Sequence, residues 1–204
     1  MPRDRYLTIR APTLAEPAKT KGSRFIGEAF PVRDGAEAMD ALEGVRRREH
    51  AATHWCWAFR LGPGDPGRSS DAGEPSGTAG RPIAREIESR DLHHVLVVVA
   101  RYYGGTKLGT GGLARAYAEA AALALEEAPK RAVTRRVQVR LGFAFPDTSP
   151  AMRTLERFDA QIADTVYTAE GTALVVRVRA SHGEALAAAF TEALGGRGQV
   201  RIDR

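Results

Sequence analysis

The last third of the chain carries the clearest alternation of apolar and polar residues. A strand pattern runs from Val137 to Phe145, returns from Leu174 to Val178, and ends with Val200 and Ile202. Helical spacing separates these stretches over residues 149–158, where Ser149-Pro150 resembles a cap and first turn, and over residues 186–194. A weaker strand pattern covers residues 162–168. The resulting order of elements predicts a ferredoxin-like βαββαβ domain.

The first two thirds predict a second unit of mixed α and β structure. Strands are expected over residues 6–10, 23–32, 55–61 and 95–100, and helices over residues 34–48, 82–90 and 113–128. Asp34 and Glu37 have the spacing of a capping box. The run from Val95 to Ala100 is uniformly apolar, which is typical of a strand buried on both faces. Since Pro129 ends the last of these helices, we predict an α+β fold with two domains, residues 1–130 and 131–204.

Strand alternation in the C-terminal domain also predicts an arginine-rich surface. If Val137, Leu174, Val200 and the apolar residues in step with them face the helices, the residues between them must face the other way. That second set contains five arginines: Arg136, Arg140, Arg177, Arg179 and Arg201. The three strands bring no aromatic side chain to this face, so phosphate contact is favoured over stacking on bases. The alternatives are a solvated face that keeps the domain soluble and a face covered by the N-terminal domain.

Charge and composition point in the same direction. The net charge is +5, and the residues from Lys130 onward hold 12 basic and 8 acidic side chains. This surplus suggests an anionic partner, although an excess of this size also serves solubility.

Cys56 is the single cysteine, which excludes an internal disulfide and indicates a reducing compartment. With no long apolar run and no secretory signal pattern, we expect a cytoplasmic protein without a membrane segment.

A glycine-rich run, residues 101–112, joins the buried strand to the next helix. Backbone N–H groups at a helix N-terminus attract negative charge, and this run adds basic and hydroxyl side chains. The order Gly-Lys-Ser/Thr of a Walker A loop is absent. We therefore predict a different anion site, formed by Arg101, Thr106, Lys107, Thr110, Gly111 and Gly112. The alternative is a tight turn whose glycines only permit positive φ.

A second loop, residues 70–82, collects carboxylates, hydroxyls and a basic residue. The candidate loop site comprises Asp71, Glu74, Ser76, Thr78 and Arg81. One carboxylate could act as a general base, but a binding role, or an ordered loop held by local side-chain hydrogen bonds, is favoured. Because both loops precede helices, we expect them on one face of the domain.

His54 and Cys56 share a strand face and invite a metal or thiol interpretation. Two ligands at this spacing are too few for zinc, and a lone cysteine is more often a small packed residue. We therefore name no catalytic residue, no metal ligand and no cofactor.

Together with residues 21–26, the stretches 53–60, 70–82 and 101–112 resemble the YigZ/IMPACT family. The resemblance covers most of residues 20–125, and its most specific parts are Gly73–Gly80 and Arg101–Gly112. The C-terminal part is similar to the small domain of bacterial members. Three positions depart from the family pattern: Ala72 replaces an acidic residue, Trp55 a histidine and Phe59 a tyrosine. These departures argue against catalysis that depends on an acidic residue at 72 and a histidine at 55.

The resemblance implies a fold and a role. The N-terminal domain is expected to look like the second domain of a small-subunit ribosomal protein, and the C-terminal domain like domain V of elongation factor G. Eukaryotic members regulate translation by competing for the activator of a kinase. The leading expectation is therefore an accessory of translation that binds RNA, the ribosome or a protein of that machinery, and is not an enzyme. A hydrolase or phosphate-handling enzyme using the two loops, and a protein-interaction module, remain alternatives.

Overall fold

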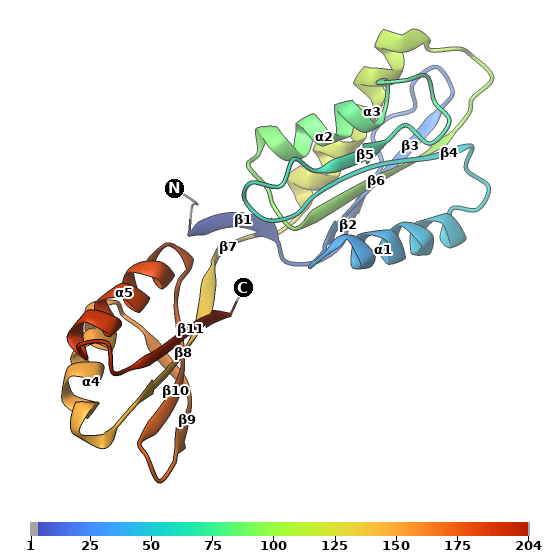
Figure 1. Cartoon of the computed structure of the whole chain (residues 1–204). Helices are drawn as coiled ribbons and strands as arrows, with labels where there is room; N and C mark the ends of the chain where they lie inside the picture. The colour runs from blue at the N-terminus through green and yellow to red at the C-terminus, as the bar shows by residue number, and fades with distance from the viewer. Residues whose placement is uncertain (1–3, 204) are drawn as a thin grey trace. The chain divides into compact units, whose positions relative to one another are not determined.

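The computed structural model describes residues 4–203, which form two compact units. The N-terminal unit comprises residues 6–133, and the C-terminal unit comprises residues 134–203 together with Asp4 and Arg5. Figure 1 shows each unit as a sheet with its own helices. The division falls three residues after the predicted one because residues 130–133 belong to β7 (Lys130–Thr134), which pairs with β1 (Arg5–Ile9).

A five-stranded antiparallel sheet forms the centre of the N-terminal unit. Its strand order is β2 (Thr13–Ala15), β3 (Arg24–Pro31), β6 (Val95–Tyr102), β4 (His54–Arg60) and β5 (Arg68–Ser70). Helices α2 (Gly80–Ser89) and α3 (Gly109–Glu127) cover one face, and α1 (Gly35–Arg48) covers the other (Figure 1). The sheet is thus sandwiched between two helical layers.

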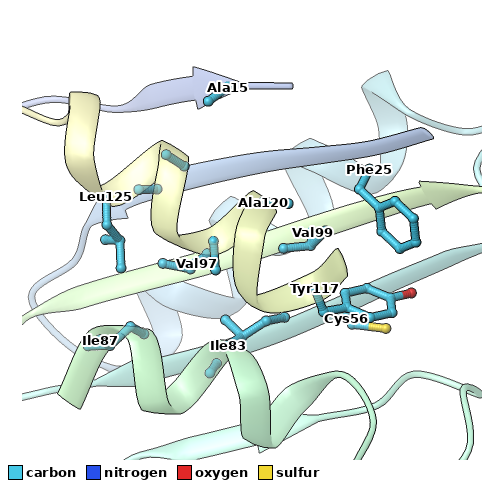
Figure 2. Packing of buried hydrophobic residues seen from close by; sticks show 14 of the residues in the cluster. Ala15, Phe25, Cys56, Ile83, Ile87, Val97, Val99, Tyr117, Ala120 and Leu125 are labelled. Atoms are coloured by element: carbon cyan, nitrogen blue, oxygen red, sulfur yellow. The ribbon is translucent and has the colours of Figure 1, made fainter. Parts of the chain in front are cut away.

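The sequence of strand β6 is uniformly apolar from Val95 to Ala100 because helices cover both of its faces. Val97 and Val99 pack with α2 and α3, whereas Leu96 and Val98 pack with α1. Figure 2 shows Val97 and Val99 in one cluster with Ile83 and Ile87 of α2 and with Ala120 and Leu125 of α3. The predicted burial on both faces is therefore confirmed.

The capping box of α1 forms with one change. The Asp34 side chain accepts a hydrogen bond from the Glu37 N–H at 2.9 Å. The Glu37 carboxylate accepts from the Arg33 N–H at 2.6 Å, one residue before the expected partner. Both carboxylates thus lie near the positive end of the helix.

The C-terminal unit has the predicted ferredoxin-like order. Its elements are β8 (Arg136–Phe143), α4 (Thr148–Arg157), β9 (Gln161–Tyr167), β10 (Thr172–Arg179), α5 (Gly183–Ala193) and β11 (Gln199–Asp203). The strand order β11-β8-β10-β9 places the first and third strands in the middle. The inward residues Val139, Leu141 and Val176 are buried against Leu155 of α4 and Phe190 of α5.

Several local predictions were wrong. Helix α2 begins at Gly80 rather than Pro82, and α3 begins at Gly109 rather than at residue 113, so the glycine-rich run ends inside that helix. Ser149 lies inside α4 and does not cap it, and Phe145 leaves the strand for a 3-10 turn, residues 145–147. Strands β2, β5 and β7 were missed, since segments this short show no reliable periodicity. No helix of residues 4–203 is long and apolar enough to cross a membrane.

Candidate functional site

The two loops singled out in the sequence line one pocket of the N-terminal unit, with a volume of about 490 Å³. Glu74 and Pro75 come from the first loop, and the stretch from Lys107 to Thr110 comes from the second. His54 at the start of β4 and Arg101 near the end of β6 also line it. The structure therefore brings both loops to one site, as expected from their position before helices.

A buried ion pair lies in the wall of this pocket. Arg101 Nη1 donates to Glu74 Oε1 at 2.5 Å, and the two side chains are 7% and 4% exposed. The Tyr117 hydroxyl of α3 donates to the same oxygen at 2.7 Å. The Arg101 guanidinium also lies 5.5 Å from the ring centroids of Phe25 and Tyr103. Glu74 is thus held by two donors, which fixes the first loop against the sheet and α3.

Asp71 organises the first loop. Its carboxylate accepts from the N–H groups of Gly77 at 2.8 Å, Ala79 at 2.9 Å and Gly80 at 2.8 Å. Burial by itself raises the pKa of this carboxyl, but the three backbone donors and the charge of Arg81 outweigh that effect and lower it. Asp71 therefore caps α2 from outside the helix, which explains why the helix begins at Gly80, and it acts as a structural anion.

The remaining candidate residues of that loop do not gather at the pocket. The Thr78 hydroxyl is buried and donates to the Pro75 carbonyl at 2.6 Å. Ser76 and Arg81 are exposed and do not line the pocket. Of the five predicted loop-site residues, Glu74 alone faces the pocket, whereas Asp71 and Thr78 hold the loop together.

The second loop is fixed by a close approach of two turns. A Cβ on Gly104 would lie 2.0 Å from the carbonyl carbon of Gly22 and 2.2 Å from the nitrogen of Ser23. The Gly104 N–H donates to the Ser23 hydroxyl at 3.1 Å. Only a glycine fits there, so this one has a packing role.

The predicted anion-binding residues divide into two groups. Arg101, Lys107 and Thr110 line the pocket, whereas Thr106, Gly111 and Gly112 do not. Gly109 lines it instead, as the first residue of α3. Anion binding by these residues stays a prediction.

Cys56 lies behind the ion pair. Burial raises its pKa to about 12, and the thiol donates to the Asp71 carbonyl at 3.0 Å. Figure 2 shows its sulfur beside the Tyr117 hydroxyl. A thiol protonated at neutral pH is a poor nucleophile or metal ligand. Among residues 4–203 no cluster of three or more His, Cys, Asp or Glu residues could hold a metal ion.

His54 borders the same wall. Its Nδ1 lies 2.9 Å from the Ala72 carbonyl, and its Nε2 lies 3.9 Å from Glu74 Oε1. A Cβ on Gly73 would approach His54 Nδ1 to 3.3 Å. The loop backbone thus orients the imidazole toward the carboxylate.

The second candidate site is the sheet face of the C-terminal unit opposite α4 and α5. Arg136, Arg140, Arg177, Arg179 and Arg201 are all exposed there, and we call this surface the arginine face. Arg140 of β8 lies directly opposite Arg201 of β11, and Arg136 lies opposite Arg179 of β10. Like charges in cross-strand pairs repel one another.

Part of this charge is compensated within the unit. Arg140 Nε donates to Asp203 Oδ2 at 2.9 Å, and Arg201 Nε lies 3.6 Å from Asp203 Oδ1. In the described part of the chain, Arg136 and Arg177 form no ion pair. Arg140 and Arg201 border a hollow of about 430 Å³, which Asp164, Val166 and Val175 also line.

Comparison with known proteins identifies the family of this chain. Residues 21–125 match the model of the Impact N-terminal domain. The chain is 40% identical to an IMPACT family member of Thermus thermophilus, over 76% of this chain and 84% of the relative. The chain belongs to the IMPACT family. It is also 35% identical to the family member YigZ of Escherichia coli, over 73% of this chain and 74% of that protein.

A solved structure supports the whole fold. The crystal structure of a hypothetical protein matches with a TM-score of 0.71 at 28% identity, covering 99% of this chain and 98% of the other. The pocket lies entirely within the Impact N-terminal domain, since its lining residues run from Thr53 to Leu113. The arginine face lies outside the matched domain.

Sequence reasoning missed part of the pocket. The spacing of Tyr117 predicts a place in the helix core, yet its hydroxyl reaches Glu74 across a separation of 43 residues. Tyr103 was not singled out, yet it lines the pocket and is 50% exposed. An aromatic residue directly beside a glycine turn was the available signal.

Proposed function

We propose that this IMPACT family member is an RNA-binding accessory of translation that contacts RNA phosphates through the arginine face. One observation carries the proposal: five exposed arginines share one face of a four-stranded sheet whose other face holds the helices. Arginine binds phosphate through several N–H donors in a fixed plane. A phosphate backbone would offset the repulsion between the cross-strand arginine pairs.

The composition of the face favours phosphate over base recognition. Its outward residues on β8, β10 and β11 include no aromatic side chain on which a base could stack. Val166 on the edge strand β9 and Val175 on β10 are apolar but not aromatic. Recognition of backbone charge and RNA shape, with little sequence preference, is the mode that fits these residues.

Co-sedimentation with purified ribosomes tests the proposal. The wild-type chain should pellet with ribosomes at low salt and be released at high salt, because bound phosphates release counterions. The variant with Arg140→Gln, Arg177→Gln and Arg201→Gln should pellet severalfold less. A matched control replaces the exposed helix residues Arg47, Arg85 and Arg153 with Gln, which removes the same charge elsewhere.

The outcomes separate the alternatives. Equal loss in both variants would attribute binding to net charge alone and contradict a role for the arginine face. Pelleting that withstands high salt and both sets of substitutions would favour a protein-interaction module with an apolar interface.

A further inference from the structure

The N-terminus of α3 faces the pocket of the N-terminal unit without a side-chain cap. Leu108 occupies the cap position and forms no capping hydrogen bond. Gly109 and Thr110, the first two residues of the helix, both line the pocket. The first N–H groups of a helix have no partner within it, and the helix dipole adds a partial positive charge. A 19-residue helix therefore directs its positive end toward this space.

Arg101 gives an independent indication of a ligand. Its side chain is only 7% exposed, yet it lines the pocket. In the described part of the chain its hydrogen bonding to protein is limited to Nη1, which donates to Glu74, and its buried Nε has no partner. A guanidinium has five N–H donors, and burying unsatisfied donors costs free energy. The Nη2 group of Arg101, for which the described part of the chain provides no hydrogen bond, is left to donate to an acceptor bound in the pocket.

Lys107 adds a positive charge at the rim of the pocket. It is exposed, it lines the pocket, and it makes no ion pair in the part of the chain that the structure describes. The one carboxylate of the pocket wall, Glu74, already accepts from Arg101 and Tyr117. The end of the pocket formed by Lys107 and the start of α3 is therefore suited to an anion.

The rest of the pocket is suited to a flat apolar group. Pro75, Leu108 and Leu113 supply apolar walls, and the exposed ring of Tyr103 supplies a surface on which an aromatic ring can stack. A volume of about 490 Å³ falls within the usual range for small-ligand sites. An anion alone would leave these walls uncovered.

We propose that this pocket binds a nucleoside monophosphate, free or as the phosphorylated 5′ end of an RNA. The phosphate lies at the N-terminus of α3 beside Lys107, and the base lies against the apolar wall and Tyr103. The site is in the N-terminal unit, so its residues are distinct from those of the arginine face. Substitutions can therefore test the two proposals separately.

Equilibrium titration of the full chain tests the pocket. The probes are the four ribonucleoside 5′-monophosphates, the matching nucleosides and inorganic phosphate. At least one monophosphate should bind. Its affinity should exceed that of its nucleoside and that of inorganic phosphate by at least about tenfold, which corresponds to about 1.4 kcal/mol. Titration of 5′-phosphorylated and 5′-hydroxyl forms of one short RNA then distinguishes the two sources of the ligand.

Matched variants locate the binding. Lys107→Ala should weaken binding of the monophosphate about tenfold and leave the nucleoside unaffected, whereas Tyr103→Ala should weaken both. Lys19→Ala removes another exposed lysine outside the pocket and should change neither. The change of Arg140, Arg177 and Arg201 to Gln should leave monophosphate binding intact. The pocket proposal is overturned if no monophosphate binds, if nucleoside and monophosphate bind equally, or if Lys107→Ala behaves like Lys19→Ala.

Discussion

Arg101 and Glu74 form a buried ion pair, with Nη1 and Oε1 2.5 Å apart, between the end of β6 and the loop before α2. A buried pair is a weak source of net stability, but removing one partner leaves an uncompensated charge. The pair thus makes the position of the 73–80 loop depend on β6, and through the Tyr117 hydroxyl on α3.

Glu74→Ala should destabilise the protein by about 3 to 5 kcal/mol, because Arg101 would remain buried without its counter-charge. The double variant with Arg101→Met should lose less than the sum of the two single variants. Urea unfolding of the three variants measures this coupling. The exposed control Glu119→Ala should change stability by less than about 0.5 kcal/mol. Additive losses would show that the pair is not coupled.

Asp71 should make stability depend on pH in the acidic range. Its folded-state pKa lies below the ordinary value of 3.8 because three backbone donors outweigh the effect of burial. The stabilisation is therefore present above the unfolded-state pKa and is lost as pH falls through the folded-state pKa. The stability advantage of the wild type over Asp71→Asn should stay constant above about pH 5 and shrink as pH falls through 3.8 and then through the lower folded-state pKa.

Unfolding measured along this pH series tests the assignment. Asp40→Asn serves as a control, since Asp40 is an exposed carboxylate of α1. An Asp71→Asn variant whose stability deficit stays constant with pH would show that the carboxylate charge has no role in the loop.

Cys56 should be unreactive in the folded protein. With its pKa raised from 9.0 to about 12 by burial, its thiolate fraction near neutral pH falls by roughly a thousandfold. Alkylation by iodoacetamide should therefore be slow until urea unfolds the chain. Cys56→Ser should leave binding of RNA and of nucleotides largely unchanged. Rapid alkylation under native conditions, or loss of binding in a folded Cys56→Ser variant, would restore a functional role for the thiol.

The Asp203 carboxylate should weaken RNA binding by the arginine face. Its carboxylate pairs with Arg140 at 2.9 Å and lies 3.6 Å from Arg201. Asp203→Asn should free both guanidinium groups and strengthen RNA binding severalfold at low salt. Glu192→Gln on α5 changes the net charge equally and should have a smaller effect. Weaker binding by Asp203→Asn would mean that the carboxylate positions the arginines and does not compete with RNA.

Long periodic elements could be predicted, and long-range polar contacts could not. The alternation through Val139, Leu174 and Val200 was enough for the ferredoxin-like order, because burial on one face fixes the register of a strand. The start of α2 was placed two residues late because its cap, Asp71, lies outside the helix. Arg101 and Glu74 are 27 residues apart, and the local sequence pattern around either residue does not indicate that the two form an ion pair. The sequence did indicate that the two loops would meet, since both precede helices.

The salt dependence of RNA affinity tests the central claim most directly. Binding of a short double-stranded RNA is measured over a series of salt concentrations for the wild type and for the variant with Arg140→Gln, Arg177→Gln and Arg201→Gln. If these arginines bind phosphates, the slope of log affinity against log salt should fall by roughly 0.7 to 0.9 for each phosphate that the variant no longer binds. An unchanged slope and affinity in the folded variant would contradict the account and leave the arginine face as a solvated surface.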